Sequence, residues 1–260
     1  MISNFSGLYK RKKMVSVPTR PQDYPYEVFS RKVLHGNSIS LDLLNDIFKD
    51  LTFKERLKKM YNYFNEEEVL MTSSFGTKSI FLLHLISQIR PHQKVHFIDT
   101  TYHFKETLEY KQQVIDFLNL DVVNVTPAPA ENALTRDEQW WNDHPKMCCT
   151  INKVAPLEPI KAAHQIWISG LMAYQTPFRS RLNIFEQQGD IVKFHPLIDI
   201  DEGEFLYYMD YFKLPKHPLE AQGYGSIGCE HCTVKGEGRS GRWVGKEKTE
   251  CGLHPGYFRK

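Results

Sequence analysis

Short apolar runs alternate with amphipathic segments from residue 67 to residue 212, and this alternation constrains the fold more than any other feature of the chain. The runs have the length of strands, and the segments between them repeat apolar residues at the three- and four-residue steps of a helix. Strands separated by helices in this way are typical of a parallel sheet with crossover connections, so we predict an α/β fold. The predicted strands are 67–72, 95–99, 121–125, 165–170 and 192–197, and the predicted helices are 41–48, 53–61, 80–90, 108–118 and 202–212.

The composition is compatible with one α/β domain that has additions at both ends. The chain has 260 residues, of which 41% are hydrophobic, enough for one large core or two small ones. We divide it into a polar N-terminal arm (1–36), an α/β domain (37–222) and a tail rich in glycine and charge (223–260). The formal charge of +2 argues against a general nucleic-acid binder, and no apolar run is long enough to span a membrane. No apolar segment follows the basic residues near the N-terminus, so we expect a cytoplasmic protein; a homo-oligomer stays open.

A loop with hydroxyl side chains follows the first predicted strand. Ser73, Ser74, Phe75 and Gly76 lead directly into a helix, where unpaired backbone N–H groups and the helix dipole favour an anion. The loop matches neither the P-loop nor the dinucleotide pattern, and an ordinary helix cap remains an alternative. In a parallel sheet this loop opens at the same edge as the turns at 99–101 and 169–170, which predicts a nucleotide site there.

The five cysteines fall into three groups. Cys148 and Cys149 are adjacent, Cys229 and Cys232 form a Cys-x-x-Cys pair, and Cys251 stands alone near the C-terminus. Four thiolates are the usual ligand set of a [4Fe–4S] cluster, and the two pairs supply that number. Adjacent cysteines are awkward for one tetrahedral zinc ion, although zinc, a redox dithiol and metal-free buried cysteines remain alternatives.

Cys251 has the surroundings of a reactive cysteine. Lys248, Gly252 and His254 flank it, and a nearby cation raises the thiolate fraction of a thiol. A free surface cysteine is the alternative. We predict that Cys251 is a nucleophile and that the rest of the chain brings a nucleotide to it.

These features resemble the assimilatory sulfonucleotide reductases, over about residues 65–260. The resemblance rests on Thr72–Gly76, Asp99-Thr100, Cys148-Cys149 with Lys153, Trp167–Leu171, Gln175 with Arg179, His195–Leu197, Cys229-x-x-Cys232, Gly241–Trp243 and the tail Lys248–His254. It implies a Rossmann-like fold of the adenine nucleotide α hydrolase type, with helices on both faces of the sheet. It also implies reduction of adenosine 5′-phosphosulfate (APS) to sulfite and AMP, or of its 3′-phosphorylated form (PAPS) to sulfite and adenosine 3′,5′-bisphosphate.

The same resemblance implies a role for each site residue. The thiolate of Cys251 would attack the sulfur and carry an S-sulfo group, which a thiol of thioredoxin or glutaredoxin would then release as sulfite. Lys153 and His254 would assist Cys251, and the two cysteine pairs would bind the [4Fe–4S] cluster. The substrate-binding residues would be Ser73, Ser74, Phe75, Gly76, Asp99, Gly170, Gln175, Arg179, Arg239 and Arg242.

Two points bear on the substrate and on rival functions. Family members with all four cluster cysteines mostly prefer APS, so APS is the expected substrate. Where the family usually has Gly-Leu-Arg-Arg, this chain has Met172 and Ala173, and Thr101 replaces a usual glycine. A pyrophosphatase-loop adenylating enzyme would have an acidic residue after Gly76, which this chain lacks, and an iron–sulfur redox sensor would need neither the loop nor Cys251.

Overall fold

The computed structural model describes residues 41–253, and it confirms an α/β fold. Six strands form one sheet in the order β3-β2-β1-β4-β6-β5. All neighbouring pairs are parallel except β5 and β6, which are antiparallel. The five predicted strands are present, and β5 is an addition that the sequence did not indicate. The strands are β1 (Val69–Ser73), β2 (Val95–Ile98), β3 (Val122–Val125), β4 (Ile166–Ile168), β5 (Phe185–Gln188) and β6 (Ile191–Phe194).

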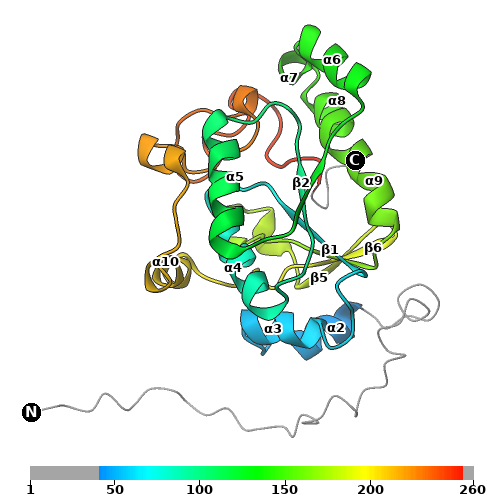
Figure 1. Cartoon of the computed structure of the whole chain (residues 1–260), viewed down its shortest axis with the longest axis vertical. Coiled ribbons are helices and arrows are strands. Elements are labelled where there is room, and N and C mark those ends of the chain that lie inside the picture. Colours follow the sequence, from blue (N-terminus) through cyan, green and yellow to red (C-terminus); the bar gives the residue numbers. More distant parts are fainter. Residues whose placement is uncertain (1–40, 254–260) are drawn as a thin grey trace, which may run out of the picture.

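Apolar side chains on both faces of the sheet are buried, as expected for parallel strands. Along β1, Val69 and Met71 belong to the larger core, and Leu70 belongs to a second cluster on the opposite face. Helices therefore cover both faces (Figure 1). The larger core includes α2 (Leu41–Phe48), α3 (Phe53–Met60), α4 (Ser79–Ile89), α5 (Lys105–Leu118) and α10 (Glu202–Tyr211), and the second includes α9 (Ala155–Ala162).

The connection between β3 and β4 is helical. It contains α6 (Pro129–Asp137), α7 (Trp140–Asp143) and α8 (Pro145–Cys149), and a π-helical turn (Thr150–Val154) joins α8 to α9. This helical arm extends beyond the sheet in Figure 1. Its position matters because Cys148 and Cys149 end α8 and Lys153 lies in the π-helical turn.

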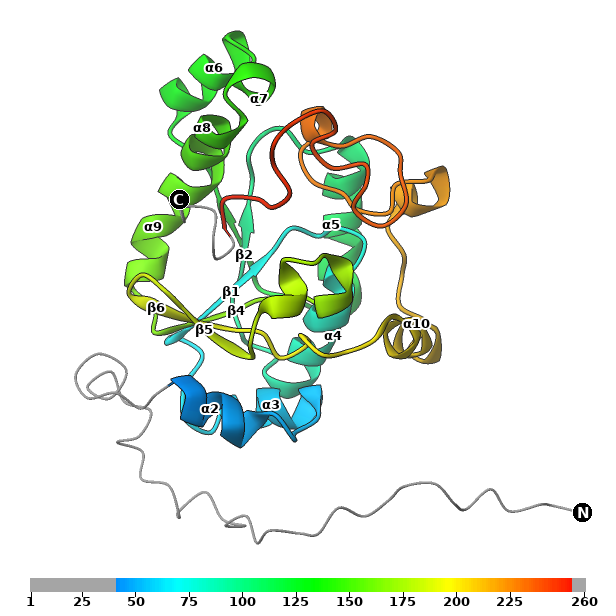
Figure 2. The same cartoon turned by 180° about the vertical axis from the view of Figure 1, so that it is seen from behind.

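The chain after α10 returns across the sheet edge. Its described part has only short 3₁₀ helices, Pro218–Gln222 and Glu230–Cys232. The hydroxyl of Thr77 donates to the carbonyl of Gly225 over 3.3 Å, which joins this segment to the loop before α4. At its other end Leu253 packs on the second core cluster, beside α9 (Figure 2). The C-terminal segment thus spans the edge where the strands end.

Some predictions lie outside the described residues. The arm 1–36 and His254 belong to this group. Among residues 41–253, no helix has both the length and the apolar character that a membrane span requires.

Candidate active site

A cavity of about 540 Å³ opens where β1 and β4 end. Its walls come from the loop after β1, the turn after β4, the π-helical turn before α9 and the C-terminal segment. Ligands of open α/β sheets bind at this edge. Of the residues predicted for catalysis or substrate binding, Ser73, Ser74, Gly76, Lys153, Gly170, Gln175, Arg179, Arg239, Arg242 and Cys251 line the cavity.

The loop after β1 presents a helix N-terminus to the cavity. Lys78 precedes α4, and no described side chain caps this helix. The N–H of Ser79 donates to the carbonyl of Gly76 over 3.0 Å, and a helix N-terminus leaves further N–H groups for an anion. Ser79, the first residue of α4, lines the cavity. The side chain of Phe75 instead lies in the core, fully buried and edge-on to Phe97, so its predicted contact with a nucleotide is limited to the backbone. Its φ of 49° is the left-handed conformation that turns the loop away from β1.

Asp99 does not line the cavity. Its carboxylate accepts a hydrogen bond from the backbone N–H of Thr101 over 2.9 Å, which fixes the turn after β2. Thr101 has a φ of 64°, a conformation that glycine adopts without steric cost, and this explains why a glycine would suit the position. The structure therefore gives Asp99 a role in the turn rather than a place among the cavity residues.

Met172 and Ala173, which stand where the family usually has two arginines, pack in the core. Met172 is fully buried in the larger core, and Ala173 packs against that core. Both follow Gly170, which lines the cavity. The turn after β4 therefore contributes apolar packing here, and the positive charge of the cavity comes from other elements.

Basic side chains dominate the charge of the cavity. Its acidic lining residues are Glu202 and Glu220 only, among those described. Such an excess of positive charge in a half-enclosed site attracts anionic ligands. The basic lining residues are Lys78, Lys153, Arg179, Lys193, Arg239 and Arg242.

Lys153 interacts electrostatically with one cysteine of each pair and with Cys251. Burial favours the neutral amine, but the negative charges of Cys229, Cys149 and Cys251 outweigh it and raise the pKa of Lys153 above its ordinary value. Lys153 is therefore protonated and close to thiols on both sides. A cation in this place can bind substrate oxygens while it faces the cysteines.

Two arginines from the C-terminal segment complete the anion site. Arg242 donates to the carbonyl of Ile227 over 3.0 Å and lies 4.4 Å from the centre of the Trp243 ring. Arg239 donates to Glu250 over 3.2 Å. Burial lowers the pKa of Arg239 to about 10, so this side chain keeps its charge at neutral pH. Both guanidinium groups retain a buried Nε–H without a protein partner among the described residues, so each has a donor left for a ligand.

Lys193 is a cavity residue that the sequence did not reveal. It lies on β6, its side chain is fully buried, and its Nζ is 4.0 Å from the centre of the Trp167 ring. A lysine within a strand usually indicates a solvent-exposed position, so the sequence offered no reason to expect Lys193 in a buried cavity. The only signal was its place in a strand whose neighbours are all apolar.

Cys251 lies at the cavity among these cations. It lines the cavity and is partly exposed. Its electrostatic interaction with Lys153, Lys193, Arg239 and Arg242 opposes the lowering of their pKa values by burial. Positive charge around a thiol favours the thiolate, which is the nucleophilic form. The structure thus combines an anion site with a candidate nucleophile.

The other four cysteines come together beside the cavity. Cys148 and Cys229 are buried in one apolar cluster with Tyr102, and Cys232 packs against that cluster. Trp141 stacks on His231 at 3.9 Å, which fastens α7 to the 3₁₀ helix of the Cys-x-x-Cys pair. The helical arm and the C-terminal segment each contribute one pair.

Hydrogen-bonding groups approach two of the four sulfurs. The ammonium of Lys248 donates to Cys149 Sγ over 2.9 Å, and the hydroxyl of Thr100 lies 3.4 Å from Cys229 Sγ. Donors of this kind stabilise thiolate ligands. Among the described residues no three His, Cys, Asp or Glu side chains are close enough for one metal ion. A cubane cluster has corners several ångströms apart and does not need such close ligands, so the donor set is compatible with [4Fe–4S].

Burial opposes the ionisation of two of these four thiols, Cys148 and Cys232. Burial, and then the charges of Cys149, Cys229 and Cys232, raise the pKa of Cys148 to about 12. Burial also raises the pKa of Cys232, and Cys229 adds to the effect. Four ionised thiols in this site therefore require compensating positive charge, which Lys153 and an iron cluster would both provide.

This fold and site define a class of proteins: α/β proteins with a mostly parallel sheet, a basic cavity at the ends of its strands and a cysteine in the cavity wall. Comparison with known families narrows the class. Residues 68–235 match the phosphoadenosine phosphosulfate reductase domain, and the chain belongs to this family of sulfonucleotide reductases, which are oxidoreductases.

Similar proteins agree with this assignment. The chain is 40% identical over 203 residues to the adenosine 5′-phosphosulfate reductase of Bacillus mycoides, an alignment that covers 75% of this chain and 86% of that protein. The reductase of the same name from Bacillus cereus is 40% identical over 198 residues, 73% of this chain and 85% of that protein.

Solved structures show the same fold at greater distance. The phosphoadenylyl-sulfate (PAPS) reductase of Candida auris, in complex with phosphate, has a TM-score of 0.65 at 24% identity and covers 76% of this chain and 98% of that one. The FMN adenylyltransferase of Candida glabrata has a TM-score of 0.52 at 16% identity, with 80% and 72% covered. These likenesses confirm the adenine nucleotide α hydrolase-like fold.

Proposed function

We propose that this protein reduces APS to sulfite and AMP, with electrons from thioredoxin or glutaredoxin, in the assimilatory sulfate reduction that leads to cysteine in the cytoplasm. The observation that carries the proposal is the position of Cys251 beside a helix N-terminus and four cations in one cavity. The names of the Bacillus relatives support APS as the substrate.

In the first step the thiolate of Cys251 attacks the sulfur atom of the phosphosulfate. A sulfur–sulfur bond forms, the bond from sulfur to the bridging oxygen breaks, and AMP leaves with the electron pair. The product is an S-sulfo group on Cys251. Lys153 and Arg242 bind the oxygens on which negative charge resides, and the backbone N–H groups before α4 bind the phosphate.

In the second step a thiolate of the reductant attacks the Cys251 sulfur. Sulfite leaves with the electron pair of the broken sulfur–sulfur bond, and a mixed disulfide joins the two proteins. The second thiol of the reductant resolves this disulfide and restores Cys251. The dithiol supplies both electrons, so the proposed cycle is balanced.

Cys148, Cys149, Cys229 and Cys232 would hold the [4Fe–4S] cluster. When bound, the cluster would supply charge next to Lys153 rather than electrons for the reaction. Lys248 donates to Cys149, and the hydroxyl of Thr100 is within hydrogen-bonding distance of Cys229, so the two contacts would fix the orientation of these sulfurs. Within the chain, Lys153 links this region to the substrate cavity.

Anaerobic purification followed by a sulfite-release assay tests the function. Wild type and Cys251→Ser are assayed with APS and with PAPS, each with reduced thioredoxin. Turnover of APS by wild type and none by the variant is the expected result. Faster turnover of PAPS would instead support the second candidate, a PAPS reductase, which the description of the matched domain favours. No sulfite from either nucleotide would refute the reductase function.

A further inference from the structure

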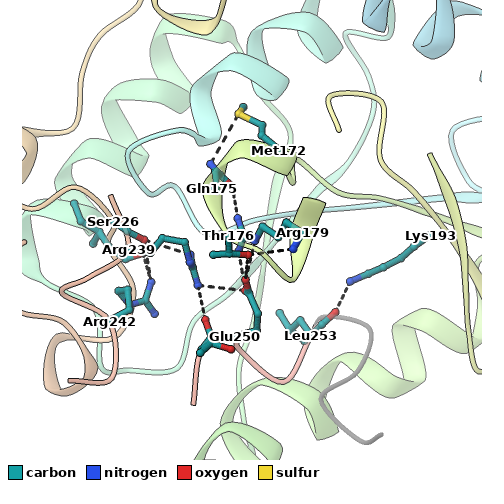
Figure 3. A network of polar contacts seen from close by, with 12 residues as sticks. Met172, Gln175, Thr176, Arg179, Lys193, Ser226, Arg239, Arg242, Glu250 and Leu253 are labelled. Carbon is teal, nitrogen blue, oxygen red and sulfur yellow. Dashed lines mark hydrogen bonds and ion pairs between the residues drawn. The ribbon is translucent and has the colours of Figure 1, made fainter. Parts of the chain in front are cut away.

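The residue before Cys251 is tied into the protein by a buried ion pair. Glu250 Oε1 and Oε2 accept hydrogen bonds of 2.8 Å from Nε and Nη2 of Arg179, and Oε2 accepts a third of 3.2 Å from Arg239 (Figure 3). The side chains of Arg179 and Glu250 are 6% and 9% exposed. A bidentate pair that is shielded from water in this way is rigid and directional.

The residue two positions after Cys251 has a second anchor. The ammonium of Lys193 donates to the backbone carbonyl of Leu253. Figure 3 shows this contact farther along the tail than Glu250. Lys193 is fully buried on β6, whereas the carbonyl that it binds belongs to the tail. Fixing the chain before and after Cys251 determines where the sulfur lies.

We propose that Arg179 and Lys193 are positioning residues that seat Cys251 in the cavity, through Glu250 on one side and Leu253 on the other. This inference rests on the proposed function of Cys251 and assigns Arg179 a role other than substrate binding. Each guanidinium nitrogen of Arg179 already donates to a protein oxygen, two to Glu250 and one to Gln175. With the tail seated, the Nε–Nη2 edge of Arg179 is occupied by Glu250.

The electrostatics of Lys193 agree with this assignment. Burial, with smaller contributions from Lys161 and Arg179, lowers the pKa of Lys193 to about 7, whereas Cys251 and Glu250 of the tail oppose this shift. The seated tail therefore stabilises the charged amine, and the charged amine in turn stabilises the seated tail, because the coupling is mutual. Lys193 and the tail form one unit.

The test uses the holoprotein with Lys193→Met and Glu250→Gln, which keep side-chain size and remove charge. Lys161→Met is the matched control, because Lys161 also lies over the Trp167 ring, at 5.9 Å, but does not line the cavity. We expect Lys193→Met and Glu250→Gln each to lower the single-turnover rate with APS about tenfold or more, while KM and the affinity for AMP change less than about twofold. Amide hydrogen exchange of the tail peptide around Cys251 becomes faster in both. Lys161→Met is no slower in turnover and no faster in exchange than wild type, because Lys161 lowers the pKa of Lys193 and its removal favours the charged amine.

A double variant separates positioning from substrate binding. Arg179→Gln combined with Glu250→Gln removes both charges of the buried Arg179–Glu250 pair, and its rate should equal that of Glu250→Gln, because both changes break this same contact. If Glu250→Gln instead tightens AMP binding or lowers KM, then Arg179 binds substrate and its proposed positioning role is wrong. Unchanged tail exchange in Lys193→Met would also overturn it. The exchange measurement needs no turnover, so it tests the positioning of the tail even if the wild-type protein releases no sulfite.

Discussion

Gly228→Ala should displace the guanidinium of Arg242 and leave the backbone in place. A Cβ at Gly228 would lie 2.1 Å from Nη2 and 2.6 Å from Cζ of Arg242, whereas ordinary contact begins at 3.4 Å. The guanidinium must therefore move by at least 3.4 − 2.1 = 1.3 Å. It is the end of a flexible side chain, so we expect the side chain to yield and the stability of the protein to change little.

The magnitude follows from what Arg242 does at the cavity. A hydrogen bond to a charged group contributes about 1.5–3 kcal/mol, and each 1.4 kcal/mol is about tenfold. If Arg242 binds the sulfate of APS, kcat/KM for APS should fall roughly 10- to 150-fold in Gly228→Ala. AMP lacks the sulfate, so its affinity should remain within about twofold of wild type.

Sulfite release from APS gives kcat/KM, and calorimetry gives the AMP affinity. Iron content is measured on each preparation, because Gly228 precedes Cys229. Gly189→Ala is the control: this glycine, with a φ of 60°, lies in the β5–β6 turn and has no atom within 4 Å of an added Cβ. Arg242→Met should match Gly228→Ala, and the double variant should be no slower.

An unchanged kcat/KM in Gly228→Ala, at wild-type iron content, would contradict this reasoning. So would an equal loss of AMP affinity, because that would move Arg242 from the sulfate to the nucleoside phosphate.

Three further predictions concern other parts of the molecule. Lys153→Met should lower kcat for sulfite release about 10²- to 10³-fold, the effect of removing one donor to developing charge; a loss confined to KM would contradict it. Arg56→Met should lower the free energy of unfolding by about 2–4 kcal/mol in urea titrations, because the buried guanidinium donates to three backbone carbonyls as well as to Asp199. Asp199→Asn should lose about 1 kcal/mol or less, because that carboxylate is mostly exposed; equal losses would refute the difference. Burial lowers the pKa of His217 to about 4, so the neutral imidazole stabilises the fold above 6.5, and this stability is lost as the pH falls from 6.5 towards 4. His217→Gln should flatten melting temperature against pH in that window, and an unchanged slope would exclude His217 as a cause.

The sheet was predictable because its strands are buried on both faces. The run at Val95–Ile98, for example, is buried at every position, so its apolar sequence identified it directly. β5 was missed because Phe185–Gln188 has one apolar residue and lies at the edge of the sheet beside β6. The helices of the 129–162 arm were missed because Pro129–Asp137 buries the polar residues Asn132 and Thr135, and Pro145–Cys149 has only 5 residues.

The site was predictable where residue type alone indicates chemistry. Cysteines are few, so their grouping drew attention to Cys251 before any fold was known. Contacts between distant segments were not predictable. The sequence suggested Arg179 as a substrate-binding residue and gave Glu250 no role of its own, and only the fold shows that the two pair out of contact with water. Lys193 is similar, because its burial depends on a tail that arrives sixty residues later.

The central claim is that Cys251 itself receives the sulfo group. One anaerobic turnover with APS and no reductant, followed by peptide mass spectrometry, tests this most directly. The account predicts one S-sulfo group on the peptide that contains Cys251, release of an equal amount of AMP, and no sulfite until thioredoxin is added. Sulfo transfer to another cysteine, or AMP and sulfite released together with Cys251 unmodified, would contradict it.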